Sequence, residues 1–97
     1  MKLVALYNHP ADPEAFDKAY FGEHIPLVEK VPGLLDTKIT RLRASMRGHD
    51  FYLMAELYFE DEAAFKKGMN SPEMAAAGES LDSFAKGEYA LLFGVEE

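Results

Sequence analysis

The sequence predicts an α+β protein in which two helices cover one face of a four-stranded sheet. Three observations lead to this prediction. Segments with strand and helix periodicity follow one another in the order β-α-β-β-α-β. The 97 residues suit one domain, which we expect to span residues 1–97. Three of the four expected strands are apolar on both faces. The order is that of the split βαβ, or ferredoxin-like, fold, in which right-handed crossovers place both helices on one face.

The first half of the chain contains a strand, a helix and a second strand. The strand over 2–7 is short, apolar and followed by turn residues. Asp12-Pro13-Glu14 is a helix start, with Asp as the N-cap and Pro at the first helical position. The helical stripe that follows is Phe16, Tyr20, His24 and Val28. Because Pro26 cannot donate to the carbonyl of Gly22, we expect a kink or break near residues 22–24.

The second half completes the pattern. The expected elements are a strand over 34–43, a hairpin loop over 44–50, a strand over 51–59, a helix over 61–68, a helix over 71–87 and a strand over 89–95. Strand 51–59 alternates most clearly, with Phe51, Leu53, Ala55, Leu57 and Phe59 on one face and Tyr52, Met54, Glu56 and Tyr58 on the other. Parity alone leaves open which of these faces meets the helices.

Apolar residues on both faces of three strands predict a partner. Leu3, Ala5 and Tyr7 oppose Val4 and Leu6 on the first strand, and the last strand repeats the pattern. Helices cover only one face, and a soluble monomer rarely leaves a large apolar patch in water. A second copy of the same sheet, packed face to face, is the simplest cover. We therefore expect a homodimer; a monomer with an apolar surface is the alternative.

Composition excludes several classes of function. Ten basic and 17 acidic residues give a net charge of −7, which argues against binding to nucleic acid and to anionic membrane surfaces. The absence of cysteine excludes disulfides and thiol chemistry. No targeting or membrane-spanning segment is visible, so we expect a cytoplasmic protein. The three histidines lie in different segments, and no phosphate-binding glycine motif occurs, so we expect neither a metal nor a nucleotide cofactor.

Four residues are candidates for chemistry, each with a structural alternative. His24 lies beside the predicted helix break and could be a general base, or a buried histidine bonded to a carbonyl. Tyr7 and Tyr20 could line a pocket, or could belong to the core with a satisfied hydroxyl. Glu56 could be a buried carboxylate that exchanges protons, or could form a structural ion pair with Arg41 or Arg43.

Several motifs together resemble those of the EthD family. They are Asp12-Pro13-Glu14-Ala15-Phe16-Asp17-x-x-Tyr20, His24-x-Pro26-Leu27, Pro32-Gly33-Leu34, Phe51-Tyr52-Leu53-Met54-Ala55-Glu56-Leu57, Ser71-Pro72-Glu73 and Ala77-Gly78-x-x-Leu81-x-x-Phe84-Ala85-x-Gly87. The resemblance covers nearly the whole chain. It implies a dimeric α/β barrel of two ferredoxin-like units, with a pocket between the sheet and the helices of each subunit. It also implies a small-molecule ligand, since members are loosely grouped as oxidoreductases.

The resemblance gives the four candidate residues possible roles. His24 matches the family's His-x-Pro and is the candidate base, and Tyr7, Tyr20 and Glu56 are the candidate substrate-binding residues. One hypothesis is a cofactor-independent monooxygenase type of enzyme acting on a small apolar or aromatic molecule, with a tyrosine hydroxyl holding the developing oxyanion. A second is a non-catalytic carrier in an oxidation pathway. A third, by analogy with fold relatives, is haem binding with His24 as axial ligand. Glu56 could instead face the dimer interface.

Overall fold

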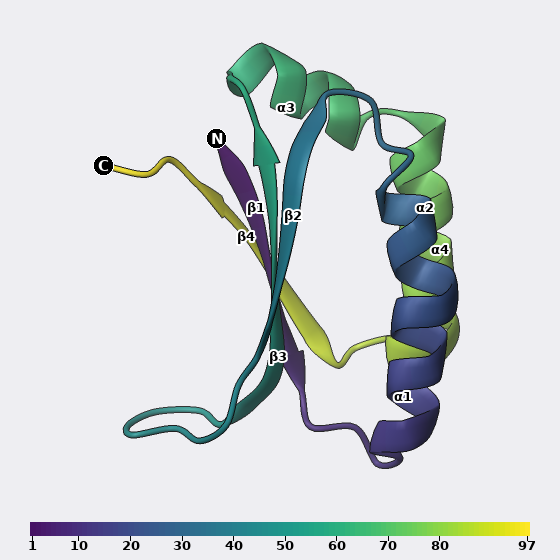
Figure 1. Cartoon of the computed structure of the whole chain (residues 1–97), viewed down its shortest axis with the longest axis vertical. Helices are drawn as coiled ribbons and strands as arrows, with labels where there is room; N and C mark the ends of the chain where they lie inside the picture. Colours follow the sequence, from purple (N-terminus) through teal and green to yellow (C-terminus); the bar gives the residue numbers. More distant parts are fainter.

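A computed structural model describes all 97 residues as one antiparallel sheet with helices along one face (Figure 1). The elements in chain order are β1 (Lys2–Asn8), α1 (Pro13–Ala19), the π-helical turn η1 (Tyr20–His24), α2 (Ile25–Val28), β2 (Leu34–Arg41), β3 (Phe51–Phe59), α3 (Glu62–Met69), α4 (Pro72–Ala85) and β4 (Tyr89–Gly94). The four strands lie in the order β2-β3-β1-β4. The predicted α+β, ferredoxin-like fold is confirmed. None of the helices is long and apolar enough to cross a membrane.

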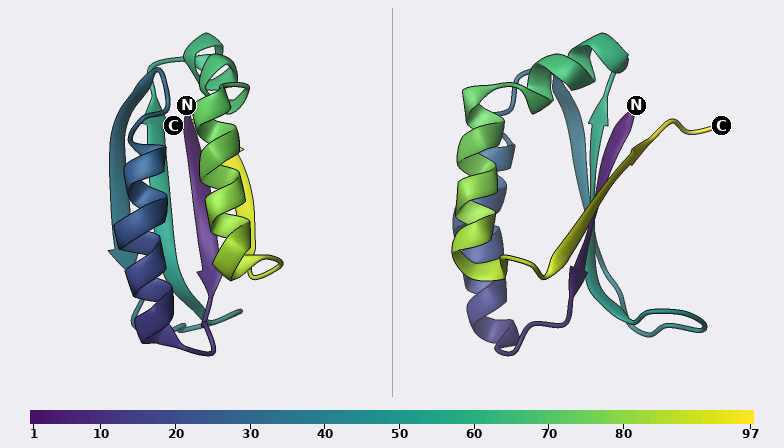
Figure 2. Two further views of the ribbon diagram at one scale, coloured as in Figure 1. Left: turned by 90° about the vertical axis from the view of Figure 1, so that its right-hand side faces the viewer. Right: turned by 180° about the vertical axis from the view of Figure 1, so that it is seen from behind.

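The helices form the second layer of the structure. The continuous run of α1, η1 and α2 lies beside α4, and both cover the same face of the sheet (Figure 2). Each helix start predicted from an Asp or Ser cap is confirmed. Asp12 Oδ1 accepts from the Ala15 amide at 3.1 Å, and Asp61 Oδ1 accepts from the Ala64 amide at 2.8 Å. Ser71 Oγ accepts from the amide of Met74 at 3.1 Å.

The predicted irregularity near residues 22–24 is a π-helical turn. The amide of Ile25 donates to the carbonyl of Tyr20, five residues earlier, instead of bonding in the α-helical pattern. This accommodates Pro26, which has no amide hydrogen and whose ring would crowd the carbonyl of Gly22 in a regular α-helix. The extra residue in the turn also rotates the side chains on either side of it. Tyr20 and His24 are buried, while Phe21 between them is exposed.

The structure decides which face of β3 meets the helices. Leu53, Ala55, Leu57 and Phe59 are buried beneath the helical layer. Glu56 lies on the other face, paired with Val4 of β1 and with Lys38 of β2.

A β-bulge changes the predicted parity at the start of β3. Tyr7 pairs with Leu53 and Asn8 with Phe51, so Tyr52 is an extra residue between two paired positions. Its hydroxyl donates to Asp17 Oδ1 of α1 at 2.8 Å, which places Tyr52 on the helical side of the sheet. Simple alternation had grouped Tyr52 with Glu56 on the opposite face. That grouping is wrong, because one unpaired residue inverts the alternation that precedes it.

The last strand is apolar on both faces and is only partly covered. Leu91 and Phe93 point to the helical side, and Leu92 points to the other side. They are respectively 54%, 71% and 50% exposed, although α4 follows the same edge of the sheet. On the side of the sheet away from the helices, the loop between β2 and β3 and the C-terminal residues both project outwards (Figure 1).

Candidate functional site

Three of the four predicted site residues meet between the sheet and the helices. Tyr7 comes from β1, and Tyr20 and His24 come from the two ends of η1. The ring centroids of Tyr7 and Tyr20 lie 5.0 Å apart, and those of Tyr20 and His24 lie 5.3 Å apart. Tyr20 is completely buried, and His24 is 5% exposed. Two polar side chains at the ends of η1 therefore lie in the interior next to a tyrosine of the sheet.

These side chains line a mainly apolar cavity of about 70 Å³, one wall of which is the half-exposed Leu91. Its other walls are almost entirely apolar and come from β1, β3, β4, α2 and α4: Leu3, Ala5, Ile25, Val28, Ala55, Leu57, Met74, Ala77, Gly78, Leu81, Tyr89 and Leu91. The position between the sheet and the helices agrees with the pocket that the sequence resemblance implied. One water molecule needs about 10–15 Å³ of cavity volume, so a cavity of this size holds a group of only a few non-hydrogen atoms.

Two polar atoms near this cavity have no hydrogen-bond partner. They are the hydroxyl of Tyr20 and Nδ1 of His24, both fully buried. No other buried side-chain nitrogen or oxygen in the chain is left unpaired. Because a buried polar group without a partner costs about 1–3 kcal/mol, native proteins rarely contain two side by side. Both residues line the same cavity.

Burial also sets the protonation states of these groups. It lowers the pKa of His24 below its ordinary value, and an interaction with the Ala77 backbone opposes this shift. The neutral imidazole is therefore favoured near neutral pH. Burial raises the pKa of Tyr7 to about 12 and is the main cause of a raised pKa at Tyr20. The two hydroxyls also interact, which raises the pKa of Tyr20 further, although no hydrogen bond between them meets the geometric limits. Both hydroxyls keep their protons at neutral pH, so they can donate hydrogen bonds to a ligand oxygen.

Glu56 does not belong to this cluster. It lies on the opposite face of the sheet, where its Oε2 is 2.8 Å from Lys2 Nζ and accepts from the Tyr58 hydroxyl at 3.2 Å. The hydrogen bond from Lys2 is the largest cause of a lowered pKa at Glu56, and burial opposes it. The expected partners Arg41 and Arg43 do not pair with it. Arg41 instead pairs with Asp17 at 3.2 Å.

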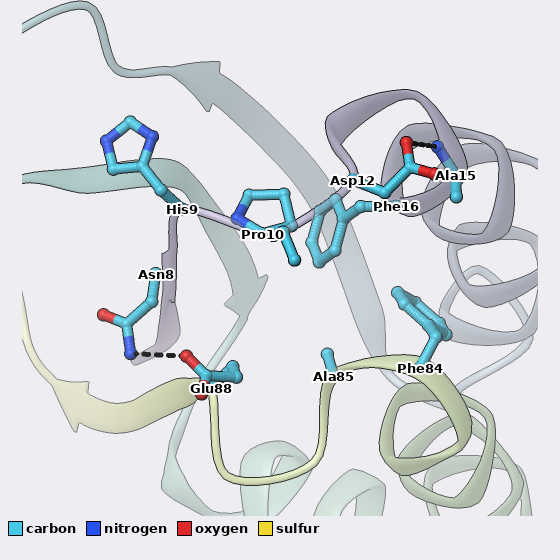
Figure 3. A pocket seen from close by; sticks show the side chains of 10 residues that line it. Asn8, His9, Pro10, Asp12, Ala15, Phe16, Phe84, Ala85 and Glu88 are labelled. Carbon is cyan, nitrogen blue, oxygen red and sulfur yellow. Dashed lines mark hydrogen bonds between the residues drawn. The ribbon is translucent and has the colours of Figure 1, made fainter.

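A second, larger pocket lies at one end of the two layers and was not predicted. It has a volume of about 510 Å³ and lies between the β1–α1 loop and the end of α4. The rings of Phe16 and Phe84 face it, and Asn8 donates to Glu88 at 3.2 Å on its opposite side (Figure 3). The sequence carried no signal for this pocket, because both phenylalanines belong to helical stripes that are typical of core packing.

The haem hypothesis does not fit this geometry. A haem with His24 as axial ligand would need space beside the imidazole, but the cavity there has only about 70 Å³. The macrocycle is several times larger, and the walls are packed side chains of the sheet and of α4. The structure also contains no group of three or more His, Cys, Asp or Glu side chains arranged to hold a metal ion.

The fold and the site define a two-layer ferredoxin-like protein with a mainly apolar cavity. Residues 8–88 match the model of the EthD domain, and the chain belongs to the EthD family. An EthD family protein from Bacillus halodurans is 41% identical, with a TM-score of 0.91 over 99% of this chain and 97% of that chain. An uncharacterized 11.0 kDa protein of Rhodococcus erythropolis, encoded in the thcB-thcC intergenic region, is 37% identical over 102 residues. The match covers 99% of this chain and 94% of that protein.

More distant solved structures share the fold. A dimeric ferredoxin-like protein of unknown function from Thermobifida fusca is 12% identical, with a TM-score of 0.69 over 97% of this chain and 89% of that chain. SnoaB, a cofactor-independent oxygenase from Streptomyces nogalater, is 18% identical, with a TM-score of 0.60 over 99% of this chain and 92% of that chain. Identities this low establish a common fold and no more.

Proposed function

We propose that this EthD protein binds a small apolar or aromatic molecule at the cavity between the sheet and the helices, with the polar end of the molecule inside the cavity, and acts on it with His24 as a base. The observation that carries the proposal is the pair of unpartnered atoms, the Tyr20 hydroxyl and His24 Nδ1, in one apolar cavity. A ligand with one oxygen at this point would satisfy both groups. Its apolar remainder would meet walls of the same character.

The protonation states support the direction of proton transfer. His24 is held neutral by burial, so its unpaired Nδ1 can accept a proton from an acidic O–H or C–H of the ligand. The negative charge then develops on the ligand oxygen. Tyr20 keeps its hydroxyl proton and can donate to that oxygen, as a residue of an oxyanion hole does.

An oxygenase of the SnoaB type is the enzyme class that this arrangement favours. SnoaB shares the fold and is described as a cofactor-independent oxygenase. In such a reaction, the base removes a proton from an easily oxidised substrate, and dioxygen is the co-reactant that oxidises the resulting anion. The chain supplies a neutral base and a hydroxyl donor in a mainly apolar site, which are the protein's part in that step.

A non-catalytic carrier is the second candidate function. The observation that favours it is the enclosure of the polar end of the cavity, where Tyr20 is fully buried and His24 is 5% exposed. A carrier would use Tyr20 and His24 for hydrogen bonding alone. A turnover assay therefore separates the two functions. In an enzyme, replacing His24 should abolish turnover of the ligand, whereas a carrier shows no turnover with or without His24.

Phenol and toluene provide a matched test of binding, since they differ by one hydroxyl. We expect wild-type protein to bind phenol about tenfold more tightly than toluene in calorimetric or ligand-detected NMR titrations, because only phenol satisfies the two unpaired groups. His24→Phe combined with Tyr20→Phe should remove the preference and leave toluene binding. Equal affinities in wild-type protein would refute the proposal. Native mass spectrometry of freshly purified protein would then identify any bound natural ligand for oxygen-uptake assays.

The proposed functional unit is a homodimer formed through the helix-free face of the sheet. Val4, Leu6 and Met54 lie on that face beside Leu92, which is half-exposed. The loop between β2 and β3 and the C-terminal residues project on the same side, so they flank the face (Figure 1). A second copy would cover this apolar surface by packing sheet against sheet. The dimeric state of the Thermobifida fusca protein supports the proposal.

Charge substitution on the helix-free face tests the dimer. Met54→Asp and Leu6→Asp would each place a carboxylate in the proposed interface, so native mass spectrometry should change from a two-chain to a one-chain mass. Phe21→Asp is the matched control, because Phe21 is an exposed apolar residue on the helical layer. A single-chain mass for wild-type protein at micromolar concentration would contradict the dimer.

A further inference from the structure

The cavity and the larger outer pocket are separated by a wall of two packed pairs of side chains, Phe16 against Tyr20 and Phe84 against His24. Phe16 and Phe84 line the outer pocket, and their rings meet edge to face with centroids 5.4 Å apart. On the inner side, Phe16 stacks on Tyr20 at 5.5 Å. The ring of Phe84 lies 6.5 Å from the ring of His24. Both phenylalanines therefore pack against side chains of the cavity. Their rings face the outer pocket (Figure 3).

Neither compartment alone makes a complete ligand site. The cavity contains the unpaired polar atoms, but its volume of about 70 Å³ is too small for an aromatic ring with substituents. The pocket has about 510 Å³, within the roughly 300–1,000 Å³ of ordinary ligand sites, but its polar side chains are solvated. The reactive groups are in one compartment and the space is in the other.

Phe84 is the less confined half of the wall. Phe16 is buried and fixed by ring contacts with Tyr7, Tyr20 and Tyr52. Phe84 is only partly buried and lies in the last turn of α4, one residue before the helix ends. Rotation of this ring towards the pocket would join the two compartments without moving the sheet.

The charges around the outer pocket restrict what it can bind. Asp12 and Glu88 line it, and no lysine or arginine does. Neither carboxylate forms an ion pair in the structure. An anionic ligand would be repelled there, whereas a neutral or cationic one would not.

We infer that the outer pocket is the binding subsite for the body of the ligand and that Phe84 is the gate between it and His24. The ligand class is a neutral or cationic molecule with an aromatic or compact apolar body and one small polar group. Its body occupies the outer pocket against Phe16, and its polar group passes Phe84 to reach Tyr20 and His24. The choice of His24 as the inner end rests on the proposed function, whereas the gate stands on the packing alone.

Access to His24 can be measured without any ligand. Diethyl pyrocarbonate acylates neutral imidazole, and peptide mass spectrometry gives the rate at His24 separately from His9 and His49. We expect Phe84→Ala to accelerate modification of His24 by about tenfold or more relative to wild-type protein, and Phe84→Trp to leave it slow. Leu81→Ala is the matched control: it removes a buried side chain of the same helix that lines the cavity but not the outer pocket.

Three results would overturn the gate. One is a rate for Phe84→Ala within about twofold of wild type. A second is equal acceleration by Leu81→Ala, which would indicate local unfolding instead of a route through Phe84. The third is acceleration by Met74→Ala alone, which would place the route at the far side of the cavity. If Phe84→Ala fails to fold, Phe84→Leu provides the same comparison with less lost volume.

A probe pair tests the ligand class of the outer pocket. 2-Naphthol is neutral at neutral pH and 2-naphthoate is anionic, and the two have similar bodies. We expect 2-naphthol to shift the amide signals of Ala11 and Ala15 and the ring signals of His24, and 2-naphthoate to shift neither. Shifts at His24 without shifts at Ala11 and Ala15 would overturn the subsite but leave the proposed function intact. Equal binding of 2-naphthoate would overturn the charge argument.

Discussion

Lys2 Nζ lies 2.8 Å from Glu56 Oε2, across the paired strands β1 and β3 and on the face of the sheet that no helix covers. A carboxylate that the family resemblance made a candidate substrate-binding residue is thus an ion-pair partner next to the proposed dimer interface. Its lowered pKa means that the folded state favours the charged form. The contribution to the free energy of unfolding is therefore present above the pKa of the unfolded chain and is lost as pH falls through the folded value.

Glu56→Gln should make the free energy of unfolding less dependent on pH in the acidic range. We expect wild-type protein to lose more of its free energy of unfolding than the variant as the pH falls from about 5 to about 3, since only the wild type must protonate a paired carboxylate. Urea unfolding at several pH values and a fixed protein concentration measures the free energy of unfolding of both proteins. Glu60→Gln, at an exposed carboxylate without an ion pair, is the control. Parallel pH curves for wild type and Glu56→Gln would contradict the role of the pair.

Removing the hydroxyl of Tyr20 should stabilise the protein. The group is buried without a partner, so Tyr20→Phe should raise the free energy of unfolding by up to about 1–3 kcal/mol. Tyr52→Phe is the matched control with the opposite expectation. The Tyr52 hydroxyl donates to Asp17 at 2.8 Å and accepts from Arg41 at 2.9 Å, so its loss should destabilise by about 1 kcal/mol. Thermal or urea unfolding compares them, and a destabilised Tyr20→Phe would show that the hydroxyl has a partner in solution.

His24 should make stability fall on mild acidification. Its pKa is lowered in the folded state, so the unfolded chain takes up a proton first as pH falls below the ordinary histidine value. We expect wild-type protein to lose stability between about pH 7.5 and about pH 5.5, and His24→Gln to lose less. This window lies above the one in which Glu56 titrates, so the two effects are separable. Identical slopes for the two proteins would show that His24 is not held neutral by the fold.

Gly68 should not tolerate a methyl group. A Cβ at this position would lie 2.7 Å from the Phe59 ring and 3.1 Å from the carbonyl oxygen of Pro32. Gly68→Ala should therefore destabilise the protein by about 1–3 kcal/mol despite the helix preference of alanine. Gly78→Ala is the control on α4, where a Cβ meets nothing within 4 Å, and it should stabilise by about 0.5–1 kcal/mol. Similar melting temperatures for the two variants would contradict the packing at Gly68.

Local patterns were enough to predict most of the elements. The caps at Asp12, Asp61 and Ser71 depend on backbone amides only three residues away, so short-range sequence identifies them. The π-helical turn was expected as a break because Pro26 forbids one particular hydrogen bond. Its form was not predictable, since an α-helix can meet the same constraint by kinking, ending or adding a residue.

The sequence by itself determined the order of the elements, the helix starts and the set of side chains that could do chemistry, because these follow from spacing and from local hydrogen bonds. Only the tertiary structure decided how those side chains are grouped. The direction in which the sheet faces its helices placed Glu56 on one side of the sheet, and Tyr7 on the other side against Tyr20 and His24. The wall between the cavity and the outer pocket could not be predicted from the sequence either. Phe16 and Phe84 lie 68 positions apart in the sequence (84 − 16), and they meet only after the layers pack. Contacts at that separation depend on the register of strands and the rotation of helices, which no local pattern encodes.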